Sequence, residues 1–410
     1  MEKAPSHFDN WERELFENRP TGWKFAKSQF LVDRQVSDVL PTDEIVTVFR
    51  DGEVTLRANR RIEGFTYSEK EIGYHHIEPG DLAIHKMDGG FGAIGISDSA
   101  GKVSPVVNLY RSESFDLRYV AYFLRAAVAT GYIESLQKGI RERSTEFDHA
   151  QFSNFYLLVP PLKTQNHIAD FLDKETSEIG TLVGELDEYI EFLEKRNNKV
   201  LIDETKIFDQ DIPTTRLGWH ARVELGKTIQ GEQQSPADVL QKYVRAGNIQ
   251  PDGRFEGEEK TMWFTPKESE MYSLKKGDVL IVEGGAGFGR SLTLEKDLVN
   301  WGFQNHIIRV RPDNGWDSKF IDYVIRAYKA AGYIDLLTVG ATIPGFSSEK
   351  AKKLKVPFLT LEEQEEIVQD ISRELSETNR IVEECTELKE ILLKRRQVLI
   401  TDVVTGKVEV

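Results

Sequence analysis

The chain has 410 residues and a formal net charge of −15 at pH 7, and 30% of its residues are charged. This length predicts two or three domains. The polar residues 1–11 contain no apolar signal-peptide region, and no stretch approaches the roughly 18 unbroken apolar residues of a membrane span. The single cysteine, Cys385, excludes an internal disulfide and a cysteine-based zinc site. We therefore expect a cytoplasmic protein that does not associate with membranes.

The sequence contains two copies of one module. Short motifs recur in the same order at offsets of 197 to 201 residues. The recurring pairs are Gly80-Asp81 with Gly277-Asp278, Gly90-Phe91-Gly92 with Gly287-Phe288-Gly289, Gly131-Tyr132-Ile133 with Gly332-Tyr333-Ile334, and Val159-Pro160 with Val356-Pro357. Solenoid repeats have periods of roughly 20–50 residues, so this offset indicates a duplicated domain. Two copies suggest a ligand with two parts, and DNA with two half-sites is the leading case.

The first part of each copy, roughly 20–160 and 213–357, mixes short β-like runs with glycine turns. The pattern predicts a helix at about 117–129, which recurs at about 318–331. The predicted strands include 44–49, 81–85, 278–283 and 306–311. Each first part is therefore expected to be an α+β domain.

The second part of each copy is predicted to be a long helix with a heptad seam. The predicted seam residues are Ile168, Leu172, Glu175, Ile179, Leu182, Leu186, Leu193 and Arg196 in the first copy, and Ile367, Ile371, Glu374, Ile381, Cys385, Leu388, Leu392 and Arg395 in the second. If the helices pair antiparallel, Glu175 lies opposite Arg395 and Glu374 opposite Arg196. The alternative is two amphipathic helices, each lying on its own domain.

The predicted fold is α+β, with two duplicated globular domains separated by two long antiparallel coiled-coil helices. The expected boundaries are 1–160 for the first domain, 161–205 for the first helix, 206–357 for the second domain, and 358–410 for the second helix and tail. Net charges of −7 in 164–204 and −6 in 361–402 account for most of the −15. The globular domains are thus near neutral, so the acidic total does not exclude DNA. The acidic helices must contact something other than phosphate.

The ordered motifs resemble those of the specificity subunits of type I restriction-modification systems, over nearly the whole chain. The motifs that carry the resemblance are Trp23 and Trp219, Leu56-Arg57-Ala58-Asn59 and Val244-Arg245-Ala246-Gly247-Asn248, the Gly-Asp and glycine-rich hairpins, Pro161 to Gln165 with its looser counterpart Phe358 to Gln364, and the end Val404-Thr405-Gly406-Lys407-Val408-Glu409-Val410. The first copy departs from the pattern after its helix, where Glu204-Thr205-Lys206 replaces Val-Thr-Gly. We interpret this stretch as a linker to the second domain.

The resemblance implies two target-recognition domains, each reading one half of a split double-stranded DNA sequence, with a spacer held by the helical pair. It also implies docking of two methyltransferase subunits and of restriction, or motor, subunits. No cofactor is expected on this chain, because S-adenosylmethionine and ATP would belong to the partner subunits.

No catalytic constellation stands out in the sequence. The Asn/Asp-Pro-Pro-Tyr/Phe element of amino-group methyltransferases is absent. The glycine-rich stretch 284–289 lacks the Lys-Ser/Thr of a phosphate-binding loop and is followed by a strand-like run, so we expect a glycine hairpin there. His75, His76 and His85 have no metal-ligand spacing. We expect a non-catalytic protein without a metal site.

DNA contacts are expected where the two copies differ, because repeated residues should build the scaffold while divergent residues read different sequences. Arginine suits guanine edges and phosphates alike. The predicted DNA-contacting residues are Arg57, Arg60, Arg61, Tyr67 and Lys86 in the first copy, and Arg245, Arg254, Lys260, Trp263 and Arg290 in the second; Arg141 and Arg143 are further candidates. The alternative for each is an ordinary solvated or ion-paired side chain.

The leading hypothesis is a DNA-recognition scaffold that directs partner enzymes. A stand-alone bipartite DNA-binding regulator is the main alternative, and it predicts DNA affinity by the isolated chain. A purely structural coiled-coil protein is disfavoured by the two duplicated α+β modules.

Overall fold

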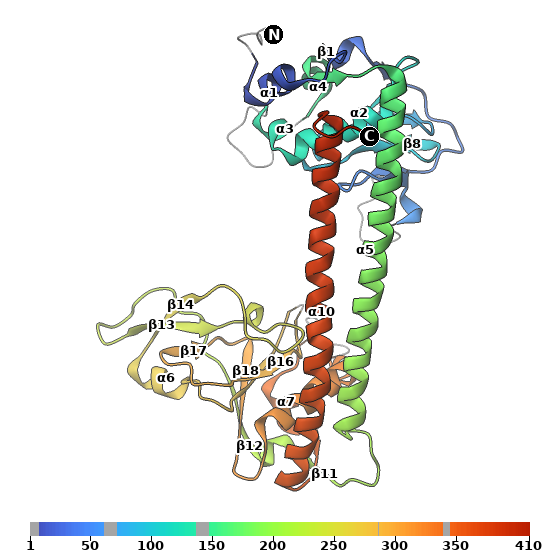
Figure 1. Cartoon of the computed structure of the whole chain (residues 1–410). Coiled ribbons are helices and arrows are strands. Elements are labelled where there is room, and N and C mark those ends of the chain that lie inside the picture. Colours follow the sequence, from blue (N-terminus) through green and yellow to red (C-terminus); the bar gives the residue numbers. More distant parts are fainter. Residues whose placement is uncertain (1–7, 61–71, 137–146, 286, 339–344) are drawn as a thin grey trace. The chain divides into compact units, whose positions relative to one another are not determined.

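The computed structural model describes residues 8–60, 72–136, 147–285, 287–338 and 345–410. The chain forms two compact units: unit 1 comprises Met1–Leu186 and Glu387–Val410, and unit 2 comprises Asp187–Thr386. Two unbroken helices, α5 (Leu162–Glu204) and α10 (Leu361–Val404), each contribute residues to both units (Figure 1).

Unit 1 is built on a four-stranded antiparallel sheet in the order β2-β9-β6-β7, with three further two-stranded pairs, β1-β10, β3-β4 and β5-β8. Its strands are β1 (Lys24–Lys27), β2 (Asp33–Gln35), β3 (Val46–Val48), β4 (Val54–Leu56), β5 (His75–Ile77), β6 (Leu82–His85), β7 (Ile94–Ile96), β8 (Gly101–Val103), β9 (Val107–Arg111) and β10 (Tyr156–Val159). Its other elements are α1 (Asn10–Asn18), α2 (Leu117–Ala129), α3 (Tyr132–Ser135), α4 (His149–Asn154) and the 3-10 turns η1 (Ser28–Phe30), η2 (Arg57–Asn59) and η3 (Gly89–Phe91).

Helix α2 illustrates how local sequence and core agree. The Asp116 carboxylate accepts a hydrogen bond from the Arg118 backbone N–H at 2.9 Å, which caps the first turn. Phe123 and Leu124 are fully buried in the core of unit 1, and α2 packs against β6 and β7. Burying each stabilises the fold by about 1.5–3 kcal/mol. Gly131 then takes a left-handed backbone (φ 75°), which ends the helix at no steric cost.

Unit 2 repeats this architecture. Its four-stranded sheet has the order β12-β18-β15-β16, the counterpart of β2-β9-β6-β7, and α7 packs on it as α2 does in unit 1. A three-stranded sheet, β14-β13-β17, is added beside it. The strands are β11 (Thr214–Arg216), β12 (Ala221–Leu225), β13 (Val239–Val244), β14 (Lys260–Phe264), β15 (Val279–Val282), β16 (Ser291–Thr293), β17 (Trp301–Phe303), β18 (Ile307–Pro312) and β19 (Lys355–Pro357). The other elements are η4 (Leu217–Trp219), η5 (Ala246–Asn248), α6 (Pro266–Met271), α7 (Ser318–Ala330), α8 (Tyr333–Leu336) and α9 (Ser348–Lys353).

The glycine-rich stretch 284–289 joins the antiparallel strands β15 and β16. Gly285 and Gly289 both have left-handed backbones, with φ of 85° and 80°. The stretch is therefore a hairpin connection and does not open a helix, as a phosphate-binding loop would.

The repeated motifs form matching internal contacts in the two units. The Arg111 guanidinium donates to the buried Asp81 carboxylate in unit 1, and Arg311 donates to the buried Asp278 in unit 2. Each pair ties an inner strand, β9 or β18, to the turn before its neighbour, β6 or β15. A buried carboxylate needs such a partner, because an unpaired charge in the interior is costly.

The Pro-Leu-x-x-Gln motif has an equally concrete role. Gln165 is buried, its Oε1 accepts from the Asp116 N–H at 3.1 Å, and its Nε2 donates to the Pro160 carbonyl at 2.8 Å. Gln364 makes the equivalent bond to the Asp317 N–H at 2.9 Å. One glutamine side chain thus fixes the start of each long helix against the start of α2 or α7.

The two long helices run antiparallel. In unit 1, Ile168 near the start of α5 shares a core with Val403 near the end of α10. In unit 2, Leu201 near the end of α5 shares a core with Ile371 near the start of α10. The predicted fold class, α+β with a duplicated module and two long antiparallel helices, is confirmed.

The observed seam differs from the predicted one at alternate positions. Ile179, Leu186 and Leu193 are buried or half-buried, as a seam requires. The covered residue that follows Ile179 or Leu186 lies four residues later, whereas the predicted one lies three residues later. Val183 is half-buried whereas Leu182 is 48% exposed. The predicted seam residues that are exposed are Leu182, Arg196, Leu388 and Arg395; those half-buried are Glu175, Leu186, Glu374, Ile381, Cys385 and Leu392; those buried are Ile168, Leu172, Ile179, Leu193, Ile367 and Ile371.

The predicted polar pairs need a similar correction. Arg196 and Glu374 do form an ion pair, with Nη2 and Oε2 3.5 Å apart, but their side chains are 47% and 40% exposed, so the pair does not lie inside an apolar seam. Within the described part of the chain, no ion pair joins Glu175 to Arg395. In several heptads, apolar residues lie both three and four residues after a seam residue. The position of the partner helix decides which of the two is covered.

The first copy keeps the backbone of the Val-Thr-Gly motif without its glycine. Lys206 has φ 55° where Gly406 has φ 72°, and both follow a buried threonine, Thr205 or Thr405, whose hydroxyl bonds back to the preceding turn. A left-handed conformation costs a non-glycine residue about 1–2 kcal/mol. The helix ending is therefore conserved in form while the sequence motif is lost.

Candidate nucleic-acid interface

The predicted DNA-contacting residues of unit 1 lie around η2 and after β6. Arg57 is half-buried and its Nε donates to the Thr47 hydroxyl at 3.2 Å. Arg60 is exposed and forms ion pairs with Asp51 and Glu53, both at 2.7 Å. Lys86 is half-buried directly after β6. Arg61, Tyr67, Arg141 and Arg143 lie outside the described residues.

Three predicted residues of unit 2 lie on the hairpin of β13 and β14 and the turn that joins it. Arg245, directly after β13, and Lys260, at the start of β14, share the carboxylate of Glu258 at 3.0 and 3.6 Å. Trp263 is half-buried opposite the exposed Leu240. The structure brings these three to one hairpin.

The other two residues of unit 2 lie elsewhere. Arg254 pairs with Asp252 in its own turn and with Glu383 of α10, at 3.2 Å. Arg290 is half-buried after the 284–289 turn, where its side chain packs on Gly287. Arg254 thus supports the packing of the domain on α10, and the five predicted residues of unit 2 do not all lie on one element.

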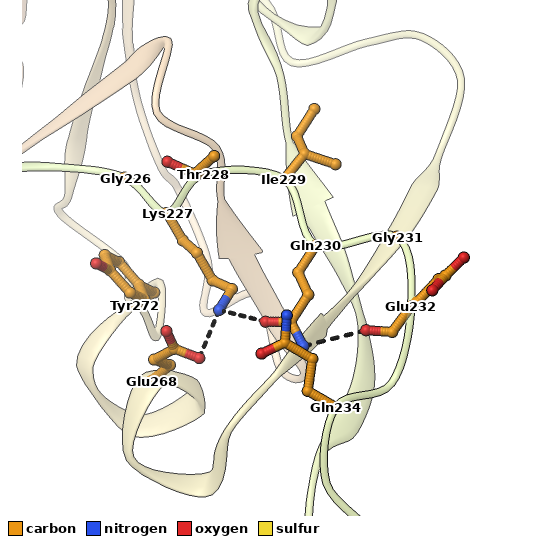
Figure 2. Close-up of a pocket in the computed structure, with 10 residues that line it drawn as sticks. All are labelled: Gly226, Lys227, Thr228, Ile229, Gln230, Gly231, Glu232, Gln234, Glu268 and Tyr272. Atoms are coloured by element: carbon orange, nitrogen blue, oxygen red, sulfur yellow. Dashed lines mark hydrogen bonds and ion pairs between the residues drawn. The ribbon is translucent and has the colours of Figure 1, made fainter.

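A polar loop that the sequence motifs did not predict, residues 226–238, lies between β12 and β13. With Glu268 and Tyr272, it lines an open pocket of about 800 Å³ (Figure 2). Lys227 is 91% buried there, and its ammonium donates to the Gln230 Oε1 at 3.0 Å and the Glu268 Oε2 at 2.6 Å. Burial alone would raise the pKa of Glu268, but the bonds from Lys227 and Thr265 outweigh it and lower that pKa below its ordinary value. The one sign of this site in the sequence is a difference in length: the loop has 13 residues, whereas the corresponding segment of the first copy, 36–45, is shorter.

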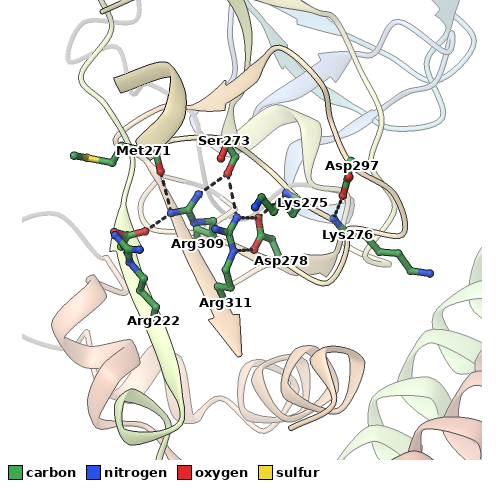
Figure 3. Close-up of polar contacts among 10 residues, drawn as sticks. Arg222, Met271, Ser273, Lys275, Lys276, Asp278, Asp297, Arg309 and Arg311 are labelled. Atoms are coloured by element: carbon green, nitrogen blue, oxygen red, sulfur yellow. Dashed lines mark hydrogen bonds and ion pairs between the residues drawn. The ribbon is translucent and has the colours of Figure 1, made fainter. Parts of the chain in front are cut away.

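A buried arginine network is centred on β18, with acceptors on β12 and at the end of α6 (Figure 3). Arg309 is 1% exposed; it forms an ion pair with Glu224 and donates to the carbonyl oxygens of Met271, at 3.1 Å, and Ser273, at 2.5 Å. Arg311 also donates to Ser273, at 3.1 Å. All of these donors point into the domain, so this network supports the fold and offers no surface to a ligand.

No group of three or more His, Cys, Asp or Glu side chains is arranged to hold a metal ion in the described ranges. Within the same ranges, no helix is long and apolar enough to cross a membrane.

The chain is similar to known proteins along most of its length. Residues 223–391 match the family model of the type I restriction modification DNA specificity domain. The StySPI specificity subunit of a type I restriction enzyme from Salmonella potsdam is 25% identical over 323 residues, which cover 72% of this chain and 68% of that protein. A chain from a solved structure of a type I restriction-modification system aligns with a TM-score of 0.64 at 11% identity, over 95% of this chain and 100% of that one, and so shares its fold.

The family model and the StySPI subunit are of the kind of protein that the duplicated motifs resemble. The resemblance indicated by the sequence is confirmed, and with it the prediction of a non-catalytic subunit. Over most of its length, the chain is thus similar to the specificity subunits of type I restriction-modification systems, and residues 223–391 match their DNA specificity domain.

Proposed function

We propose that this chain recognises a bipartite double-stranded DNA target, one half-site by each unit, and docks two methyltransferase subunits and the restriction subunits. The observation that carries the proposal is the contrast between repeated interior and divergent surface. The Asp81–Arg111 and Asp278–Arg311 pairs are common to both units. The loop 226–238 differs in length and composition from the corresponding segment 36–45 of unit 1. Two units with the same interior and different surface loops are suited to bind two DNA half-sites of different sequence.

The two long helices carry features that suit protein docking. Tyr189 and Phe192 are 45% and 60% exposed on α5, and their rings stack at 6.4 Å. Leu388 and Ile391, the equivalent positions of α10, are 47% and 62% exposed. Acidic residues surround both pairs, which disfavours DNA phosphate as the occupant. Two equivalent apolar pairs support the proposal of two methyltransferases per chain.

The chain itself would bind no cofactor, since S-adenosylmethionine and ATP act in partner subunits, and it would work in the cytoplasm. α5 and α10 would set the spacer between half-sites. DNA advances about 3.4 Å per base pair, so inserting four residues in the middle of each helix, about 6 Å, should lengthen the recognised spacer by one or two base pairs.

The test uses the full chain with its cognate methyltransferase. Sites methylated by the complex are mapped by sequencing, first for the natural chain and then after residues 23–158 are replaced by the matching module of a relative. We expect one half-site to change and the other to persist. Simultaneous change of both half-sites would contradict one half-site per unit.

A second measurement addresses the partners and the alternative. Phe192→Asp and Ile391→Asp should each remove one methyltransferase from the complex in gel filtration with light scattering, while each variant keeps its melting temperature. Specific DNA binding by the chain alone, unchanged by added methyltransferase, would favour a stand-alone bipartite regulator.

A further inference from the structure

The loop 226–238 of unit 2 has an ordered backbone that does not depend on its tip side chains. The Lys227 N–H donates to the Phe303 carbonyl at 3.0 Å, and the Trp263 N–H donates to the Gln230 carbonyl at 2.9 Å. Asp238 is buried and accepts from the N–H groups of Gln234 and Ser235, both at 3.0 Å. The loop is therefore held at its start, middle and end.

The floor of the pocket is also satisfied internally. The Lys227 ammonium is held by Gln230 and Glu268, and the Gln230 Nε2 donates to the Glu232 carbonyl at 3.1 Å (Figure 2). The same Nε2 also donates to the Asp238 Oδ2 at 3.3 Å. A buried ammonium requires such partners. The floor groups therefore have little capacity for a ligand, and they fix the geometry of the rim.

The rim has the opposite character. Thr228, Ile229 and Gln234 are exposed, and Ile229 is 53% exposed. The Gln234 side chain lines the pocket (Figure 2), and its amide forms no hydrogen bond with any part of the chain that the structure describes. Gln234 thus presents an unengaged carboxamide to the pocket that Thr228 and Ile229 also line.

This combination matches the major-groove edge of an A·T pair. A glutamine amide forms two hydrogen bonds with N6 and N7 of adenine, and methyl groups of threonine or isoleucine contact the thymine methyl. The corresponding segment of unit 1, residues 36–45 between β2 and β3, contains no glutamine or asparagine. The readout would therefore belong to unit 2 alone.

We propose that Gln234 reads an adenine in the half-site recognised by unit 2, through the major groove, with Thr228 and Ile229 against the paired thymine. This inference rests on the proposed function and assigns its base contact in the second unit. The neighbouring Gln233 does not line the pocket, which makes it a matched control.

The experiment compares the natural chain, Gln234→Ala and Gln233→Ala, each in complex with the cognate methyltransferase. Methylation is measured on duplexes that carry every base at every position of both mapped half-sites. Gln234→Ala should lose discrimination for adenine at one position of the second half-site by at least about five-fold, the lower end for a two-bond base contact. Gln233→Ala should keep the natural preferences.

The natural chain provides an independent measurement. Replacing each adenine of the second half-site by 7-deazaadenine removes the N7 acceptor, and binding should weaken at the position that Gln234→Ala relaxes. Gln234→Ala with unchanged preferences, or with an equal loss at all positions, would overturn the inference. A natural complex without a bipartite target would refute the proposed function itself.

Discussion

The buried Arg309 of unit 2 stands where unit 1 has Leu109, because β18 and β9 occupy equivalent places in the two sheets. Its strand partner Glu224 likewise corresponds to Gln35, which lies opposite Leu109. Unit 1 thus supplies a natural replacement for the pair. The variants are Arg309→Leu, Glu224→Gln, and the two together, which transfer the unit 1 pair into unit 2.

Each single change leaves one charge without its partner. Removing one member of a buried ion pair costs about 3–5 kcal/mol. Glu224 also bonds Arg222 at 2.6 Å and its side chain is 23% exposed, so we expect about 3 kcal/mol for Arg309→Leu. Glu224→Gln leaves Arg309 buried and should cost a similar amount. The double variant removes both charges and should cost about 3 kcal/mol, well below the sum, which gives a coupling of about 2–3 kcal/mol.

The assay is urea unfolding of the full chain, with hydrogen exchange of the β18 amides to assign the transition to unit 2. Burial alone would raise the pKa of Glu224, but the bonds and charges of Arg309 and Arg222 lower it overall. The stability that a lowered carboxyl pKa supplies is present above the ordinary glutamate pKa and is lost as pH falls through the folded one. The stability difference between the natural chain and Arg309→Leu should therefore shrink in acid. A double variant that loses about 6 kcal/mol, the sum of the singles, would refute the coupling.

Three further predictions concern single positions. Lys206→Gly should stabilise unit 2 by about 0.5–1 kcal/mol, because it relieves the left-handed backbone. Gly406→Ala should destabilise unit 1, since the new Cβ would lie 2.3 Å from a proline ring. Thermal unfolding measures both, and a loss of stability in Lys206→Gly would contradict the backbone argument. Hydrogen bonds to Glu78 and Asp43 outweigh burial and raise the pKa of His76. His76→Gln should therefore cost most stability below the ordinary histidine pKa, and progressively less as the pH rises through the pKa of the folded state. A loss of stability that does not change with pH would disprove this. Arg196→Ala should cost less than about 1 kcal/mol because its ion pair is half exposed, and a larger loss in urea unfolding would place that pair inside the seam.

The sequence by itself determined the duplication, the α+β class and the long helices. The motif Gly131-Tyr132-Ile133 begins with a left-handed turn, and in the motif Pro161 to Gln165 the glutamine accepts a hydrogen bond from the start of α2. Both act through residue types that the sequence shows directly. The net charge of each segment was equally readable, since it needs no coordinates. The resemblance to the type I specificity subunits followed from the order of these motifs.

The tertiary structure decided which side chains of a repeated pattern meet. Leu182 and Val183 are both apolar, and only the position of the neighbouring helix leaves the first exposed and covers the second. The pocket loop 226–238 depends on Glu268 and Phe303, which lie 41 and 76 residues beyond Lys227. Contacts at such separations arise when strands and helices pack, and no local propensity encodes them, so a sequence predicts that a basic or amide side chain exists without predicting whether it is free to bind.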